Sequence, residues 1–268
     1  MKVQDIYTYP VKSLGGIKTD SALALEKGFQ FDRRWMLVDL DGKFLSQRTE
    51  HQLALFQTQI TEGGLLVTHK LDFENGVTIP FSTTLQNSLE VSVWDDTVEA
   101  LALSEEIDDW FSSYLKKPCR LVFFPEGYER AVSPKYADHG ENVSFADAFP
   151  YLLISQASLD DLNQKLDKPV PMNRFRPNLV VAGVEPFSED IWKEIQIGEV
   201  RFKVAKPCAR CVLTTVDQET GIKGREPLAT LARYRTVDKK VLFGQNLLAL
   251  NEGRINAGDP VRIISYKS

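Results

Sequence analysis

Residues 192–217 read WKEIQIGEVRFKVAKPCARCVLTTVD, and this stretch holds the patterns that say most about fold and chemistry. Polar and apolar residues alternate over Glu199–Val204, which is typical of a strand with one buried face. Gly198 separates this strand from Trp192–Ile197, so we predict a β-hairpin. The β-branched run Val212–Val216 predicts a further strand directly after the second cysteine.

Short strands are also expected across the first hundred residues. Turn signals separate apolar runs at Asp41-Gly42, Glu62-Gly63-Gly64, Asn75-Gly76 and Asp95-Asp96. The strands expected between them include Trp35–Asp39, Lys43–Gln47, Leu53–Ile60 and Leu65–His69. Strands and turns at this spacing indicate a barrel or a sandwich.

A helix should follow, because apolar residues recur at helical spacing at Ile107, Trp110, Phe111 and Tyr114. Lys116-Lys117-Pro118 closes it, and we place a domain boundary near residue 118. The second half mixes the two kinds of element. We expect strands at Cys119–Phe124, Leu179–Ala182, Leu247–Leu250 and Val261–Ile264, and helices around Leu159–Leu166 and Pro227–Tyr234. Residues 125–148 show no periodicity and predict a long loop.

Composition narrows the class of protein. Of 268 residues, 32 are Lys or Arg and 37 are Asp or Glu, and the net charge of −5 disfavours nucleic acid as a partner. No apolar run approaches the roughly 18 residues needed to cross a bilayer, and the N-terminus lacks the apolar core of a secretory signal. Three cysteines cannot form a disulfide framework and suit a reducing compartment. We therefore expect a cytoplasmic protein that does not bind a membrane.

The segment Lys206–Asp217 allows several interpretations of its two cysteines. A zinc site needs four ligands, and the other candidates, Cys119 and three histidines, are scattered. A thioredoxin-type pair would sit at a helix N-terminus, whereas Cys211 leads into an expected strand. A single thiolate flanked by Lys206 and Arg210 could complete the coordination of a metal brought by an organic cofactor. Two cysteines packed as small hydrophobic residues remain the structural alternative.

Cationic and amide residues at expected strand ends form a second group of candidates. Tyr9-Pro10-Val11-Lys12-Ser13 follows the first strand, Asp32-Arg33-Arg34-Trp35 precedes another, and Asn173-Arg174-Phe175-Arg176-Pro177-Asn178 precedes a third. Point charges, forked donors and amides suit a phosphate group joined to a heterocycle.

Together these motifs resemble the MOSC-domain proteins that carry an N-terminal MOSC β-barrel module, among them the mitochondrial amidoxime-reducing component and its bacterial relatives. The resemblance rests on YPVKS, DRRW, NRFRPNLVV, PCARCVLTTVD, EPLATLARYR, LFGQNLLAL and GDPVRI, in this order. It implies a mainly β fold with helices (α+β), with a barrel-like module over residues 1–118 and a MOSC β-barrel domain with peripheral helices over residues 119–268.

The resemblance also implies a site for the molybdenum cofactor, a pterin dithiolene with a terminal phosphate (Mo-molybdopterin), between the two modules. By this similarity Cys211 is the metal ligand and the catalytic residue, and Cys208 is a neighbour without that role. Lys12, Ser13 and Arg33 correspond to the phosphate end, and Arg176, Asn178 and Asp147 to the pterin.

The implied reaction is the two-electron reduction of a small N-hydroxylated substrate, an amidoxime or a hydroxylamine. Because the chain shows no cysteine cluster for an iron–sulfur module, we expect electrons from a separate iron–sulfur or flavin protein. The alternative is a carrier of the cofactor or of sulfur without its own turnover, since MOSC domains also end molybdenum cofactor sulfurases. Residues 125–148 could form one wall of the substrate access.

Overall fold

The computed structural model describes residues 1–81 and 87–267, and β-strands make up most of its regular structure. In the largest sheet the order of hydrogen-bonded strands is β19-β14-β15-β17-β12-β13-β1-β2, and β16 pairs with β17. These strands are β1 (Lys2–Thr8), β2 (Ile17–Thr19), β12 (Tyr151–Ser155), β13 (Leu179–Ala182), β14 (Trp192–Ile197), β15 (Val200–Ala209), β16 (Thr236–Val237), β17 (Lys240–Ala249) and β19 (Val261–Tyr266). The predicted hairpin is confirmed, with Ile197 opposite Val200.

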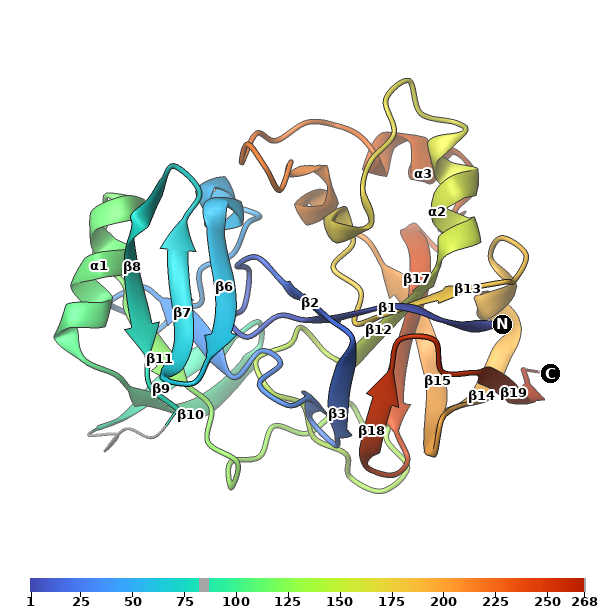
Figure 1. Cartoon of the computed structure of the whole chain (residues 1–268), viewed down its shortest axis with the longest axis horizontal. Helices are drawn as coiled ribbons and strands as arrows, with labels where there is room; N and C mark the ends of the chain where they lie inside the picture. Colours follow the sequence, from blue (N-terminus) through green and yellow to red (C-terminus); the bar gives the residue numbers. More distant parts are fainter. Residues whose placement is uncertain (82–86, 268) are drawn as a thin grey trace.

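Two of the three smaller sheets form the other side of the molecule, where α1 packs beside β8, and the third lies beside β15 of the large sheet (Figure 1). One has the order β5-β11-β10-β9, with β5 (Trp35–Val38), β11 (Arg120–Phe123), β10 (Asp96–Ala102) and β9 (Ser88–Val93). Another has the order β6-β7-β8, with β6 (Phe56–Thr61), β7 (Gly64–His69) and β8 (Asp72–Ile79). A third joins β18 (Gly253–Asn256), β3 (Ser21–Leu25) and β4 (Gly28–Phe29). The predicted class, mainly β with helices, is confirmed.

The sheets cross the sequence boundary expected at residue 118. Strands β1 and β2, from the first twenty residues, lie in the large sheet, where β1 pairs with β13. In the opposite direction β11 follows the boundary but pairs with β5, so that Arg120 faces Val38. Each half of the chain therefore lends strands to the other, and loops from both halves meet between them.

The helices are peripheral and agree with the sequence patterns. In α1 (Glu105–Leu115) the rings of Trp110 and Phe111 lie 5.7 and 5.5 Å from that of Phe56, so the predicted stripe covers the β6–β8 sheet. Helix α2 (Gln156–Asn163) is capped by Ser155, whose side chain accepts a hydrogen bond from the Ser158 amide. Helix α3 is Leu228–Tyr234. Within the described ranges, no helix has the length and apolar character needed to span a membrane.

Several local predictions are wrong. Asn75-Gly76 lies inside β8 instead of making a turn, at the irregularity where the β7–β8 register shifts between the Val67–Val77 and His69–Asp72 pairs. Lys43–Gln47 makes only isolated bridges, Lys43 to Ser92 and Phe44 to Val38. Val212–Thr215 is a 3-10 helix and not a strand. The hydroxyls of Thr214 and Thr215 donate to the carbonyls of Cys211 and Val212 at 3.0 and 2.7 Å, and such local bonds compete with extended structure.

Further short 3-10 turns are His51–Leu55, Met172–Arg174 and Ser188–Ile191. The first of these replaces the beginning of the strand expected over Leu53–Ile60. The predicted long loop is confirmed, because residues 125–148 carry no helix or strand and only the bridge between Ala131 and Asn142. Arg130 fixes the end of this loop by donating to the carbonyl oxygens of Ser144, Ala146 and Asp147 at 2.9, 2.6 and 3.0 Å.

Candidate functional site

The structure brings every predicted site residue into one cleft between the two halves. The side chains that line it include Lys12, Ser13, Arg33, Asp147, Arg176, Asn178 and Cys211. They come from the segments after β1, before β5, at the end of the long loop, before β13 and after β15. Clefts between modules are common places for ligand binding.

Lys12 is buried at the floor of this cleft. Its Nζ donates to the Phe145 carbonyl at 2.8 Å and to Asp147 Oδ1 at 2.6 Å. Burial lowers the pKa of Lys12 to about 8, although Asp147 opposes the shift. Burial would raise the pKa of Asp147, but Lys12 and Arg48 outweigh it and hold that pKa well below its ordinary value. Both groups are therefore charged at neutral pH.

Ser13 turns the chain beside Lys12. Its φ of 70° is a left-handed conformation that non-glycine residues seldom adopt. Gln47 Nε2 donates to the Ser13 carbonyl at 2.6 Å and so fixes this turn. The backbone amide of Lys12 donates to the Trp35 carbonyl at 2.8 Å, which ties the turn to β5.

The buried carboxylate of Asp32 binds the Arg33 guanidinium. Its Nη1 donates to Asp32 Oδ2 and, at 3.0 Å, to Asn178 Oδ1. Asp32 is 1% exposed and also accepts from the Tyr9 amide at 2.8 Å. The guanidinium of Arg33 lies over the Tyr9 ring, 4.4 Å from its centroid. These contacts fix the direction in which Arg33 presents its charge.

Asn178 uses its whole amide within the protein. Besides Arg33, its Oδ1 accepts from the Leu152 amide at 3.2 Å, and its Nδ2 donates to the Tyr7 carbonyl and to Asp32 Oδ1, both at 3.1 Å. A side-chain amide has two donors and two acceptor positions, and all are engaged here. The geometry thus makes Asn178 a positioning residue for Arg33. A hydrogen bond to a pterin stays a prediction and would require one of these bonds to exchange.

Arg176, in the segment before β13, also lines the cleft. Its φ is 55°, its Nη1 donates to the Leu14 carbonyl at 2.6 Å, and its guanidinium lies 4.3 Å from the Tyr9 ring centroid. Burial lowers the pKa of Arg176 to about 10, with Tyr9 acting in the opposite direction. It therefore stays charged at neutral pH.

Cys211 precedes the 3-10 helix Val212–Thr215 and is partly exposed. Arg48 Nε donates to Cys211 Sγ at 3.3 Å, while Arg48 Nη2 donates to Asp147 Oδ2 at 2.8 Å. Arg48 also lies 4.2 Å from the Trp94 ring centroid, and Trp94 Nε1 donates to Asp147 Oδ1 at 3.2 Å. The thiol is thus placed beside a cation from the N-terminal module.

Sequence reasoning missed Arg48. The cations expected beside the thiol were Lys206 and Arg210. Arg210 lines the cleft but donates to Cys208 Sγ, whereas Lys206 lies elsewhere. Lys206 Nζ lies over the rings of Tyr136 and Phe149, at 4.8 and 5.2 Å. Arg48 carries the signal used for Arg33, an arginine next to an expected strand, here directly after Lys43–Gln47. Only tertiary structure shows that it faces Cys211.

Cys208 has a different environment, although it lines the same cleft. Its Sγ accepts a hydrogen bond from Arg210 Nη1 at 3.0 Å, and its side chain packs against the cluster that contains Phe175. Arg210 Nη2 in turn donates to the Phe175 carbonyl at 2.6 Å. The two thiols are therefore held by different arginines.

The side chains of this cleft suit an anionic ligand with a soft metal. Lys12, Arg33, Arg48 and Arg176 outnumber the carboxylates Asp32 and Asp147. Charge-assisted hydrogen bonds from such groups recognise phosphate, and a thiol offers a soft ligand. Over residues 1–81 and 87–267, no group of three or more His, Cys, Asp or Glu side chains is placed to hold a metal ion.

The fold and the cleft define a two-module β protein with a thiol-bearing site, and family comparison identifies the class. Residues 1–118 match the MOSC N-terminal beta barrel domain and residues 140–262 match the MOSC domain. The chain therefore belongs to the MOSC family.

Within that family the chain is similar to amidoxime-reducing components. It is 35% identical to mitochondrial amidoxime-reducing component 1 of Homo sapiens over 98% of this chain and 82% of that protein. It is 36% identical to mitochondrial amidoxime reducing component 2 of Rattus norvegicus over 97% of this chain and 82% of that protein. The molybdenum cofactor sulfurase of Oryza sativa subsp. japonica is 33% identical over 90% of this chain and 32% of that protein.

Proposed function

We propose that this protein binds the molybdenum cofactor in the Cys211 cleft and reduces small N-hydroxylated compounds, amidoximes or hydroxylamines. The electrons would come from a separate iron–sulfur or flavin protein. The observation that carries the proposal is the convergence in one cleft of the thiol of Cys211 with the cations of Lys12, Arg33 and Arg176. The similarity to amidoxime-reducing components supports the choice of reaction.

The residues present fit such a cofactor by the chemistry of their donors. Cys211 would be the soft ligand that a metal already chelated by the two dithiolene sulfurs of the cofactor can accept from the protein. Lys12, Ser13 and Arg33 form a polar corner suited to a phosphate, because two of them are cations braced by buried partners. Asp147 and Arg176 would face the heterocycle.

The bound cofactor would supply a metal that accepts oxygen and passes on two electrons. The overall change takes an N-hydroxyl group, two electrons and two protons to an N–H group and water, with cleavage of the N–O bond. The chain's own groups bind and orient. Arg48 holds the Cys211 side chain in place from the N-terminal side, and Asp147 fixes Arg48 through its Nη2.

The experiment measures turnover by protein that has been loaded with the molybdenum cofactor. Protein made in a host that synthesises the cofactor should contain molybdenum and should reduce benzamidoxime when a chemical electron donor is supplied. Protein from a host that cannot make the cofactor is the matched control. Molybdenum-loaded protein that reduces neither benzamidoxime nor hydroxylamine would contradict the reductase assignment.

The second candidate is a carrier that binds the cofactor, or sulfur for it, without turnover. The similarity to a molybdenum cofactor sulfurase favours it, because the match covers the MOSC modules and only a third of that protein. Molybdenum bound without reduction of either substrate would support this candidate. A cytoplasmic location, expected from the three free cysteines, remains part of the proposal.

A further inference from the structure

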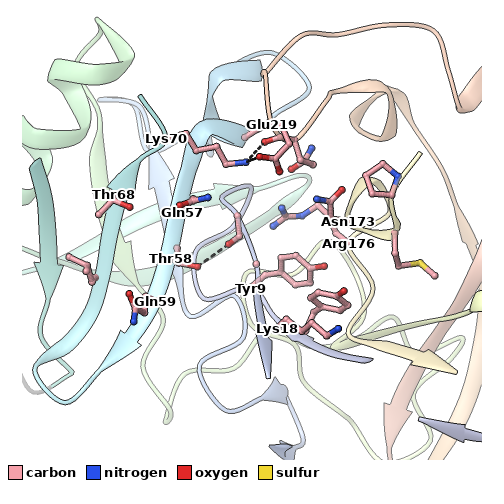
Figure 2. Close-up of a pocket in the computed structure, with 18 residues that line it drawn as sticks. Tyr9, Lys18, Gln57, Thr58, Gln59, Thr68, Lys70, Asn173, Arg176 and Glu219 are labelled. Carbon is pink, nitrogen blue, oxygen red and sulfur yellow. Dashed lines mark hydrogen bonds and ion pairs between the residues drawn. The ribbon is translucent and has the colours of Figure 1, made fainter. Parts of the chain in front are cut away.

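A second cavity, larger than the Cys211 cleft, lies between the two halves of the chain. Its volume is about 500 Å³, against about 150 Å³ for the Cys211 cleft. It opens between the β6–β7 face and the segment 171–176, and Figure 2 shows side chains of the two halves facing each other across it. Among the lining residues described for the two spaces, Arg176 alone is common to both. We call this space the interface cavity.

The cations of the interface cavity are unequally compensated. Lys70 is paired with Glu219 at 2.8 Å, and Lys18 is paired with Asp5 at 2.6 Å. Within the described part of the chain, Arg176 makes no ion pair, and its one side-chain hydrogen bond goes to the Leu14 carbonyl. A guanidinium has five N–H donors, and a buried charge without a counter-ion is costly. Arg176 thus has capacity for an anion at the wall of this cavity.

The same wall contains polar atoms without partners. The Tyr9 hydroxyl and the Asn173 Oδ1 are buried, and within the described structure neither atom has a hydrogen-bond partner. The Tyr9 residue is 2% exposed. Buried polar groups are nearly always paired, so unpaired ones need an explanation. In Figure 2, Tyr9, Asn173 and Arg176 stand together on one side, and Gln57, Thr58 and Gln59 of β6 stand on the other. An occupant with donors and acceptors would give both orphaned groups a partner.

The aromatic side chains of this wall pack against one another and against backbone. The rings of Tyr7 and Tyr9 are stacked, with centroids 6.5 Å apart and planes 28° apart. Met172 adds apolar surface, and Gly16 contacts the Tyr9 ring so closely that an added Cβ would lie 2.3 Å from it. The Tyr9 ring is therefore held firmly, with its edge packed against backbone.

From these observations we propose that the interface cavity is a second ligand site, which binds a small carboxylate. Arg176 takes the carboxylate, and the Asn173 amide and the Tyr9 hydroxyl bond to further polar atoms of the occupant. The site requires neither a metal nor the reaction proposed above. Because Arg176 also lines the Cys211 cleft, an occupant that binds Arg176 in the interface cavity would alter the Cys211 cleft through that one side chain.

The test uses nicotinate as the probe and nicotinamide, its neutral counterpart, as the matched control. Both are titrated into the full-length protein, and the side-chain amide signals of Asn173 and Gln57 are followed by NMR. We expect saturable shifts of these signals with nicotinate, and binding of nicotinamide weaker by about tenfold or more because it lacks the charge.

Substitutions test whether nicotinate binds in the interface cavity. Asn173→Leu and Tyr9→Phe should each weaken nicotinate binding about three- to tenfold, since each removes one hydrogen-bonding group. Gln164→Leu, which removes an exposed amide outside the cavity, should change nothing, and Lys12→Ala should also leave binding intact. Equal affinity for nicotinamide, or binding that is lost in Lys12→Ala but kept in both cavity variants, would overturn the proposal. So would unmoved Asn173 and Gln57 signals at saturating nicotinate.

Discussion

The two walls of the Cys211 cleft are built in opposite ways. The cationic wall, Lys12, Arg33 and Arg48, comes from three separate places in the first fifty residues and is held by long-range contacts to Asp147 and Asn178. The thiol wall, Cys208, Arg210 and Cys211, is one short run between the end of β15 and a 3-10 turn. One wall is assembled by the fold, and the other is set by local sequence.

In the proposed function the two walls bind different parts of the ligand, the thiol wall the metal and the cationic wall the anionic group. In the proposed function only one of the two thiols in the thiol wall, that of Cys211, binds the metal, so its loss removes a function that the cationic wall cannot replace. The cationic wall spreads charge over several residues, so the loss of one of them weakens binding of an anion by a limited factor. Substitutions in the two walls should therefore differ in the size of their effects.

The largest effect is expected in the thiol wall. Cys211→Ser should lose nearly all bound molybdenum, because a serine hydroxyl is a poor ligand for a soft site. Cys208→Ser is the matched control and should keep most of it, because its Sγ is held by Arg210. Elemental analysis of the purified variants measures the difference, and equal losses would contradict the assignment of the ligand.

In the cationic wall the strongest effect should come from Arg33. Arg33→Ala removes charge-assisted hydrogen bonds of about 1.5–3 kcal/mol, so cofactor retention should weaken about 10- to 100-fold. Arg201→Ala, at an exposed position, is the control. Because Asp32 would be left buried without its partner, thermal unfolding should be measured on the same samples. Unchanged metal occupancy in folded Arg33→Ala protein would remove this residue from the site.

A pH dependence should follow from Lys12. Burial lowers the pKa of Lys12 to about 8, so the free protein loses this cation as the pH rises through 8. Above that pH the cofactor must bind together with a proton, and its affinity should fall by up to about tenfold per pH unit. Cofactor release measured between pH 7 and 9 checks this, and Lys12→Arg should give a flat profile. A wild-type profile as flat as that of the variant would show that Lys12 does not bind the anion.

The smallest effect is expected from Arg48, at the rim where the two walls touch. Arg48→Ala should lower metal retention only about threefold, because it removes one hydrogen bond to Sγ while leaving the ligand in place. Trp94→Phe keeps an aromatic ring beside Arg48 and should have less effect still. A loss in Arg48→Ala as large as that in Cys211→Ser would mean that the walls are not separable.

Sequence patterns predicted the strand that leads to the thiol wall, whereas the role of Cys211, like those of Lys12 and Arg33, was implied by the family resemblance. The alternation over Glu199–Val204 fixed the hairpin, and the short spacing of the cysteines left few ways to place them. The run Val212–Val216 misled because β-branched side chains favour strands, while the hydroxyls of Thr214 and Thr215 turn back to the chain and make a 3-10 turn.

The cationic wall depends on contacts that no local pattern encodes. Lys12 and Arg33 were found through family motifs, but Arg48 has no distinctive neighbours, and its partner Cys211 is 163 residues away. The full engagement of Asn178 by Tyr7, Asp32, Arg33 and Leu152 is likewise a product of packing. The crossing of strands between the two halves, with β11 on β5, could not be read from a boundary drawn at residue 118.

The most direct test of the whole account is X-ray absorption spectroscopy at the molybdenum edge, on fully loaded protein. The account predicts that the metal in the wild-type protein has one sulfur neighbour more than the metal that can be reconstituted into Cys211→Ser protein, and that Cys208→Ser matches the wild type. The same number of sulfur neighbours in the wild type and in Cys211→Ser would contradict it.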